Sequence, residues 1–556
     1  MNYDNYAERG GRFIRGAAIL SITGIIAKVL GAFFRIPLNN WIGAEGMSYY
    51  GVAYPIYSFF LIIATAGLPV GISKMVSDRV AREDYANAHR IYKVSLYLMA
   101  FLGIAGFIIC FFGADFIAAA MGNEGGAASL RAIAPALLTA PLVSSFRGYS
   151  QGQQDMLPTG ASEMAEQLLR VIAGLSLSYL FLQGGMGLEK AASGATFGAS
   201  AGSIAALLLL LVIYASRGRA RNERIRKSTA PRESNKNILK ELLRIAVPIT
   251  IGSAILPFMM MIDLMLVMNR LQATGWSYEE SKVLYGLISG FCDPLIGFPQ
   301  VFTIAVSVSL VPAVSAAFAR KDYDDVHHNV QVGIKTGMII SFPCMVGLIT
   351  LAKPILMLLY PSQLEDAVAS TLTLQILSLG VVCLTILRTY SSVLQGIGRA
   401  GIPVINLTIG VIFKFIVTWI LVGIPSININ GAAIGNVVAY GTTAILNYIM
   451  VRKLTGTRVS TFHTYVKPLA ASLIMGVGAY FSYQGFYSLL GSNSLATLAA
   501  IVIAVIVYVL AIFLTRCISE DEILLMPKGR TLLRICRRLH LVKRKDDPYA
   551  DYVPRH

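Results

Sequence analysis

The chain carries the nonapeptide AREDYANAH at residues 81–89 and a near copy of it, ARKDYDDVH, at residues 319–327. Each copy follows a long apolar run with prolines near both ends. Further along, a Gln-Gly pair, a proline and a basic residue recur at nearly equal separations, first as Gln151-Gly152, Pro158 and Arg170 and then as Gln395-Gly396, Pro403 and Lys414. The match is too extensive for chance, so we predict that the chain is built from two related halves.

The residues around this repeat are those of a membrane protein. Of the 556 residues, 55% are hydrophobic and 14% are charged, which departs in both respects from an ordinary soluble domain. A bilayer core needs about 20 apolar residues per helix, and such stretches follow one another with short polar breaks. The sequence predicts an all-α polytopic protein of about 14 spans, at 13–37, 50–72, 91–113, 129–150, 161–183, 192–215, 241–268, 284–318, 331–352, 369–395, 402–424, 431–451, 464–485 and 495–515.

The basic residues of the loops set the topology. With the N-terminus inside, the cytoplasmic segments hold almost all of them, including the run from Arg217 to Lys240, whereas the opposite loops hold only Lys190, Arg270, Lys282 and Lys353. This asymmetry follows the positive-inside rule and predicts that both termini are cytoplasmic. It also explains the formal net charge of +17 without a nucleic-acid partner.

The repeat divides the chain into two six-helix lobes, expected at residues 1–216 and 241–453. Because six is even, both lobes have the same orientation, and transporters of this design bind their substrate between the repeats. Residues 217–240 are expected to form a flexible basic linker beside anionic lipid heads, residues 454–515 to form accessory helices 13 and 14, and residues 516–556 to form a basic cytoplasmic tail. A duplication that serves only packing is the alternative. The repeat also favours one kinked helix, and not two short ones, for the proline-rich stretch 284–319.

Charged residues inside the spans are the candidates for function, because a charge at the bilayer centre costs on the order of 2.5–3.5 kcal/mol. Lys28, Arg170 and Lys414 fall near the middle of spans, and Asp293 lies about mid-depth in the eighth. A second group lies nearer helix ends, where long side chains can also reach the interface: Arg15, Arg35, Arg147 and Arg388. An excess of cations in a cavity would favour an anionic, phosphate-bearing cargo.

Private ion pairs are the alternative for the central charges. Lys28 could pair with Asp263 or Asp293, and Arg170 and Lys414 could form structural salt bridges with carboxylates such as Glu163 or Glu166. The residues alone do not choose between the two interpretations.

The sequence lacks the motifs of catalysis. Residues 198–202 fit GxSxG and residues 396–401 fit GxGxxG, but neither has the strand-to-helix context that these motifs need. We therefore expect no catalytic residue, no cofactor and no metal site, and thus no enzyme.

Five short stretches give the chain a resemblance to the multidrug/oligosaccharidyl-lipid/polysaccharide exporter superfamily, and within it to the group of lipid II flippases and stage V sporulation protein B. They are Ala27-Lys28-Val29-Leu30-Gly31, Gly67-Leu68-Pro69, Gly297-Phe298-Pro299 with Val311-Pro312, and Gln395-Gly396-Ile397-Gly398. The resemblance covers essentially the whole chain. It implies two pseudosymmetric six-helix lobes around a cationic cavity and two extra helices that form a groove for a lipid tail.

The resemblance extends to single residues only in part. Lys28 matches a cationic position of the family and Asp293 an acidic one. Phe34 and Pro294 stand where Gram-negative members have basic residues, and Arg35 stands where they have an acid. The class of cargo is therefore better supported than any residue-level phosphate contact.

The expected function is that of a flippase in the bacterial cytoplasmic membrane. It would carry a polyprenyl-pyrophosphate-linked saccharide, foremost lipid II, from the inner to the outer leaflet by alternating access. The expected partners are this lipid-linked oligosaccharide and membrane lipids, with a coupling ion left open. The alternatives are a cation-coupled multidrug exporter, a flippase for another polysaccharide or spore-cortex precursor, and a membrane glycosyltransferase, for which no loop is large enough.

Overall fold

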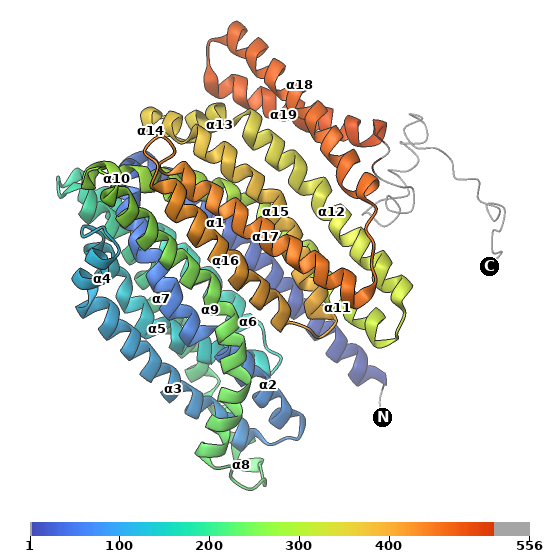
Figure 1. Cartoon of the computed structure of the whole chain (residues 1–556). Coiled ribbons are helices and arrows are strands. Elements are labelled where there is room, and N and C mark those ends of the chain that lie inside the picture. Colours follow the sequence, from blue (N-terminus) through green and yellow to red (C-terminus); the bar gives the residue numbers. More distant parts are fainter. Residues whose placement is uncertain (1–2, 516, 518–556) are drawn as a thin grey trace, which may run out of the picture. The chain divides into compact units, whose positions relative to one another are not determined.

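The computed structural model describes the backbone of residues 3–515 and Cys517, and the side chains from Thr23 onward apart from those of residues 25, 28, 29 and 32 (Figure 1). All regular elements in this part are helices, as predicted. Twelve described helical segments are long and apolar enough to cross a membrane, which shows a polytopic all-α protein. The predicted basic tail lies outside the described residues except for Cys517.

The helices follow one another with short connections. In the first part of the chain they are α1 (Tyr3–Thr65), α2 (Leu68–Ala81), α3 (Tyr85–Phe112), α4 (Ala114–Ala120), α5 (Gly126–Gly152), α6 (Leu157–Gln183), α7 (Gly187–Ser216), α8 (Gly218–Lys227), α9 (Asn235–Ala273), α10 (Tyr278–Gly286), the π-helical turn η1 (Leu287–Cys292) and α11 (Asp293–Ala319). Then come α12 (Tyr323–Thr350), α13 (Ala352–Leu359), α14 (Leu364–Ala369), α15 (Thr371–Gly396), α16 (Gly401–Val422), α17 (Asn430–Thr455), η2 (Phe462–Val466), α18 (Lys467–Leu490) and α19 (Asn493–Leu514).

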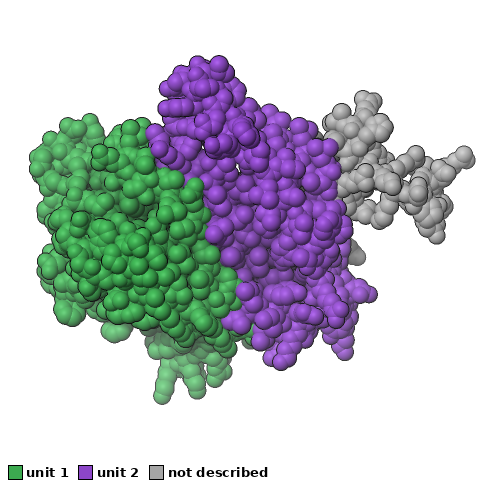
Figure 2. Space-filling view, turned by 45° about the horizontal axis from the view of Figure 1, so that its top comes forward, with its two compact units in different colours: residues 1–301, 359–377, 401–443 green, residues 302–358, 378–400, 444–556 purple. Residues whose placement is uncertain are grey.

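The chain forms two compact units, coloured green and purple in Figure 2. Unit 1 comprises residues 1–301, 359–377 and 401–443, and unit 2 comprises residues 302–358, 378–400 and 444–556. In unit 1, α5 packs against α1, α3 and α7, and α9 packs against α1, α2 and α16. In unit 2, α18 packs against α12 and α19. The expected division into lobes at residues 217–240 remains a prediction.

The twelve candidate segments of the described residues cover most of the expected 14 spans, and the two numbers differ for local reasons. Residues 33–81 form one candidate segment, since the turn after the first expected span is only a kink at Gly43, and α18 is not among the twelve segments. The stretch 278–319 is one continuous helical run, as expected, in which α10, η1 and α11 follow without a break. Its proline Pro294 follows directly after the π-helical turn η1, where the regular α-helical hydrogen-bond pattern is already interrupted.

The two copies of the nonapeptide encode the same turn. In the first copy, Glu83 has φ 60° and Asp84 caps α3 by accepting a hydrogen bond from the Asn87 N–H. In the second, Lys321 has φ 58° and Asp322 caps α12 by accepting a hydrogen bond from the Asp325 N–H. The repeat therefore serves a structural purpose, because each copy ends one helix and begins the next.

The linker predicted to be flexible is instead largely attached. Residues 218–227 form helix α8, and the segment after it is hydrogen-bonded to α2 and α3. Arg79 forms ion pairs with Glu233 at 3.0 Å and with Glu241 at 2.8 Å. The Asn87 side chain donates to the Pro231 carbonyl at 2.8 Å and accepts from the Glu233 N–H at 2.9 Å. Polar residues, which in the sequence suggest a loop, here form hydrogen bonds with the backbone of a segment packed against α2 and α3.

The bend in α1 at Gly43 lies in unit 1 against α10. Gly43 has φ 61°, a left-handed conformation that glycine adopts without a Cβ penalty. The next residue, Ala44, donates its N–H to the Asp366 carboxylate at 2.8 Å. Burial raises the pKa of the Asp366 carboxyl, and this hydrogen bond opposes the shift because it favours the charged form.

A buried lysine ties this bend to α10. The Lys282 side chain is 3% exposed, and its ammonium lies 3.1 Å from Glu45, 2.6 Å from Glu279 and 2.7 Å from the Tyr49 hydroxyl. From the sequence, Lys282 is expected in an outer loop. In the structure it lies within α10, because a capping box formed by Ser277 and Glu280 begins this helix before Lys282. Its three partners provide the hydrogen bonds that a buried ammonium requires.

Gly286 allows the closest contact of this region, and its replacement provides a test of the packing. A Cβ on Gly286 would lie 1.8 Å from the Ala44 carbonyl oxygen, which belongs to the backbone and cannot rotate away. Gly286→Ala should therefore lower the melting temperature of the purified protein, although alanine favours helix formation by about 1 kcal/mol. Gly297→Ala is the matched control in the same helical run, since no atom lies within 4 Å of its Cβ position. Equal melting temperatures of the two variants would contradict the packing described.

Candidate functional site

Of the eight residues predicted to line a cavity, the structure describes the side chains of six. Lys28 and Arg15 lie on α1, but their side chains are outside the described ones. Arg35, Arg147, Arg170, Lys414 and Asp293 belong to unit 1, and Arg388 belongs to unit 2. Arg388 is half-buried on α15 and interacts with neighbouring groups.

Two predicted arginines of unit 1 share one carboxylate. Glu166 accepts from Arg147 of α5 at 3.0 Å through one oxygen and from Arg170, one turn further along α6, at 3.0 Å through the other. The three side chains are only 15% to 21% exposed. Glu163, one turn before Glu166, accepts a hydrogen bond from the Thr23 hydroxyl of α1. Two cations and two carboxylates therefore meet at the α1, α5 and α6 faces.

A second charged cluster joins α1, α9, α11 and α16. Lys414 is nearly buried and lies 3.0 Å from Asp263. Asp293 has an exposed side chain, and the charges that act on it are those of Arg35, Asp263 and Lys414. Arg35 donates a hydrogen bond to the Ser289 carbonyl at 3.2 Å and lies 5.7 Å from the centre of the Tyr50 ring. No carboxylate within the described part of the chain pairs with Arg35.

A column of tyrosines connects the two clusters along the second arm of α1. Tyr50 and Tyr54 stack at 5.9 Å, and the rings of Tyr54 and Tyr57 are 6.3 Å apart. Arg170 interacts electrostatically with all three tyrosines, and Tyr50 also interacts with Arg35. Sequence reasoning missed this column, although positions 50, 54 and 57 have the spacing of one helix face.

The described charges of these clusters balance. The basic residues are Arg35, Arg147, Arg170 and Lys414, and the acidic residues are Glu163, Glu166, Asp263 and Asp293. The expected excess of cations is therefore not seen among the described side chains. For Arg170 and Lys414 the structure shows the alternative of ion pairs, with Glu166 and Asp263 respectively.

The pairing leaves hydrogen-bonding capacity unused. Among the described residues, Arg170 Nε and Asp263 Oδ1 are buried without a hydrogen-bond partner. An unmade hydrogen bond of a buried charged group is costly, so both atoms favour a ligand, water or a second conformation. Arg170 therefore keeps an N–H group that an acceptor could use, and Asp263 keeps an oxygen that a donor could use.

The cations are also distributed along their helices. At a rise of about 1.5 Å per residue, Arg147 lies about 8 Å from the end of α5, Arg170 and Lys414 lie about 20 Å from the starts of α6 and α16, and Arg35 lies about 12 Å before the bend at Gly43. The predicted topology places Arg147 near the inner surface, Arg170 and Lys414 at mid-depth, and Arg35 toward the outer surface. No group of three or more His, Cys, Asp or Glu residues in the described part could hold a metal ion.

Comparison with known proteins places the chain among membrane transporters. A family model described as polysaccharide biosynthesis protein matches residues 13–318, and the MatE model matches residues 288–420. In Bacillus subtilis (strain 168), the uncharacterized membrane protein YabM is 28% identical over 536 residues, which cover 94% of this chain and 96% of YabM. The lipid II flippase MurJ of the same organism is 25% identical over 496 residues, which cover 85% of this chain and 90% of that protein.

Solved structures share the fold at low identity. An inward closed conformation of lipid II flippase MurJ aligns with TM-score 0.66 and 17% identity, and covers 88% of this chain and 97% of that chain. An inward-facing multidrug resistance MATE family transporter of the MOP superfamily aligns with TM-score 0.66 and 18% identity, and covers 79% of this chain and 98% of that chain.

The polysaccharide biosynthesis model matches more than half of the chain, and the helical architecture agrees with it. The chain therefore belongs to the polysaccharide biosynthesis protein family, within the multidrug/oligosaccharidyl-lipid/polysaccharide exporter superfamily of multi-pass membrane transporters, and is not an enzyme.

Proposed function

We propose that this protein is a flippase that moves a lipid-linked saccharide, with a pyrophosphate linkage as in lipid II, from the inner to the outer leaflet. The observation that carries the proposal is the continuous run of arginines and tyrosines in unit 1, from Arg147 and Arg170 past the tyrosine column to Arg35. In the predicted topology this run offers guanidinium groups at several depths of the membrane, where a pyrophosphate could be bound as the protein changes conformation.

Guanidinium groups suit this cargo because they bind phosphate oxygens in a bidentate manner. Arg147 and Arg170 each contact one oxygen of Glu166, so their remaining guanidinium N–H groups could bind a pyrophosphate while Glu166 keeps both contacts. The tyrosine hydroxyls offer donors and acceptors to sugar hydroxyls. Arg35, which has no carboxylate partner in the described part of the chain, would receive the phosphates toward the outer side.

The direction of transport follows from charge. The predicted topology has both termini in the cytoplasm, where the membrane potential is negative. An uncompensated anionic charge gains about 2.3 kcal/mol per 100 mV on moving outward. Export of a pyrophosphate can therefore proceed by alternating access without ATP.

The length of the chain favours a lipid-linked cargo over a drug. The alignment with the MATE transporter includes 79% of this chain, and the alignment with MurJ includes 88% of this chain. Both solved structures are aligned almost over their full length. In unit 2, the hairpin of α18 and α19 packs against α12 (Figure 1). The hairpin exposes large apolar side chains, among them Phe481 and Val502. We propose that it guides the polyprenyl tail.

A cation-coupled multidrug exporter is the second candidate. It is favoured by the exposed Asp293, by the unpartnered oxygen of Asp263 and by the equal TM-score of the MATE transporter. A carboxylate that exchanges protons or sodium ions could use these two groups.

A genetic experiment separates the two candidates. Expression in a strain depleted of its lipid II flippase should restore growth if lipid II is the cargo. The same gene in a strain that lacks its drug exporters should leave drug sensitivity unchanged. Failure to rescue growth together with increased drug resistance would favour the exporter, and failure in both strains would point to another polysaccharide or spore-cortex precursor.

Arg35 provides a direct test of the proposed path. Arg35→Gln removes a charge-assisted contact worth about 1.5–3 kcal/mol, so the rate of lipid II flipping by reconstituted protein should fall roughly 10-fold or more. Arg131→Gln is the matched control, because Arg131 lies on α5 in an exposed pair with Asp115. An unchanged rate in Arg35→Gln, with folded protein of normal amount, would remove Arg35 from the path.

Replacement of Glu166 should have opposite effects on the stability of the protein and on its binding of pyrophosphate. Glu166→Gln should lower the melting temperature, because Arg147 and Arg170 lose their shared counter-charge. A polyprenyl pyrophosphate should then raise the melting temperature more in the variant than in the wild type, since its phosphates meet two unpaired guanidinium groups. Asp115→Asn serves as the control outside the cluster. A smaller ligand-induced shift in Glu166→Gln than in the wild type would contradict binding at these arginines.

A further inference from the structure

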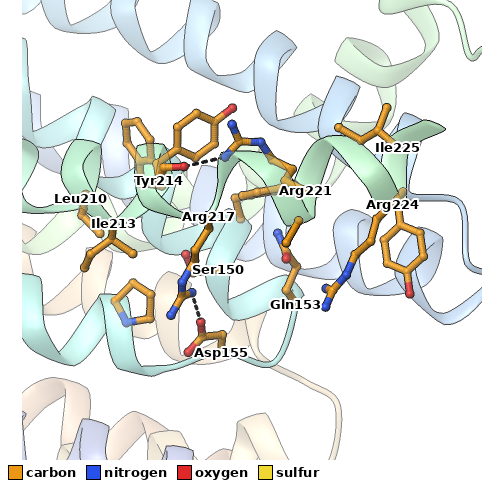
Figure 3. A pocket seen from close by; sticks show the side chains of 15 residues that line it. Ser150, Gln153, Asp155, Leu210, Ile213, Tyr214, Arg217, Arg221, Arg224 and Ile225 are labelled. Atoms are coloured by element: carbon orange, nitrogen blue, oxygen red, sulfur yellow. Dashed lines mark hydrogen bonds and ion pairs between the residues drawn. The ribbon is translucent and has the colours of Figure 1, made fainter. Parts of the chain in front are cut away.

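A pocket of about 400 Å³ lies in unit 1 at the ends of α5 and α7 and is covered by α8. It is apart from the charged run described above, which lies deeper along the helices. Figure 3 shows Arg217, Arg221 and Arg224 projecting from α8 and the residue before it, opposite Ser150, Gln153 and Asp155. The floor includes the apolar side chains of Leu210 and Ile213. The pocket thus combines a basic rim with an apolar base.

The arginines of this pocket are oriented by aromatic rings. Arg221 lies 3.6 Å from the centre of the Tyr214 ring and donates to the Tyr214 carbonyl at 2.8 Å. Arg224 lies 5.9 Å from the centre of the Tyr85 ring. The close contact with Tyr214 fixes the guanidinium plane of Arg221, and the longer contact of Arg224 with Tyr85 is electrostatic.

The charge of the pocket is not balanced. Asp155 is the only acidic residue that lines it in the described part of the chain, and it forms an ion pair with Arg217. Arg221 and Arg224 have no carboxylate partner among the described residues. Arg221 Nε is also buried without a hydrogen-bond acceptor within the described structure. These two cations and an unused buried donor favour an anion with several oxygens.

The adjoining surface extends the basic rim. A second pocket shares Tyr85 and Arg224 with the first, and Arg82 and Lys227 also line it. Glu83 and Asp84 line it as well, but Asp84 is occupied as the cap of α3. A phosphate in the first pocket would therefore have further cations within reach of its substituents.

We propose that this pocket binds the phosphate of an anionic phospholipid headgroup from the inner leaflet. The positive-inside topology puts α8 at the cytoplasmic surface, where anionic lipids are the most concentrated phosphate-bearing molecules and are attracted to basic segments. The apolar floor at the end of α7 suits the glycerol and acyl part of a lipid. Because the bound lipid would hold α8 against α5 and α7, this site anchors the connection that follows the first six expected spans.

The experiment compares lipid binding by full-length protein variants in detergent. Native mass spectrometry would measure retention of phosphatidylglycerol, with phosphatidylcholine as the neutral lipid. The double variant Arg221→Gln/Arg224→Gln should lose at least 10-fold in phosphatidylglycerol affinity. The control Arg219→Gln/Arg226→Gln removes the same charge from exposed positions of α8 that line neither pocket, and it should retain wild-type affinity.

Three outcomes decide the proposal. Equal loss in both double variants would show a diffuse basic surface and overturn it. Displacement of the lipid by millimolar inorganic phosphate or a nucleoside monophosphate would assign the pocket to a soluble phosphate ligand and overturn the lipid assignment. If size-exclusion chromatography shows that the double variant is misfolded, the single variant Arg224→Gln replaces it, because the described contact of Arg224 is only the Tyr85 ring. Unchanged phosphatidylglycerol affinity of this single variant would also overturn the proposal.

Discussion

A charge in the apolar interior of a membrane protein must find a counter-charge, water or a ligand, and this constraint explains the organisation of unit 1. Arg147 and Arg170 find Glu166, Lys414 finds Asp263, and Lys282 finds Glu45 and Glu279. Buried pairs of this kind contribute little net stability compared with apolar residues of the same volume. The Lys282 pairs join α1 to α10, whereas for the pairs at Glu166 and Asp263 we propose a role in transport.

The pairing changes the way in which an anionic cargo would be recognised. The sequence suggested an excess of cations, but the described side chains form a balanced network in which arginines share carboxylates. Such a network is tolerable when the site is empty, and we propose that its arginines also bind the phosphates of the cargo. Arg35, with its carbonyl and ring contacts, differs from the others because its charge is available without exchange.

Apolar runs and turn chemistry predicted most of the fold. The long stretch 284–319 is the continuous run expected, and the nonapeptides, read from sequence only as a repeat, prove to hold the helix caps Asp84 and Asp322. Contacts between distant residues were not predictable in the same way. The bend at Gly43, the burial of Lys282 and the docking of the segment after α8 depend on partners far along the chain. For the site, sequence identified the charged residues but could not decide which carboxylate each cation meets.

The most direct measurement is transport of a fluorescent polyprenyl-pyrophosphate-linked saccharide by the purified wild-type protein in proteoliposomes, followed by the loss of signal to a membrane-impermeant quencher. We predict protein-dependent movement between leaflets that is faster than that of the corresponding lipid without the pyrophosphate. Equal movement of the two lipids, or none above protein-free vesicles, would contradict it.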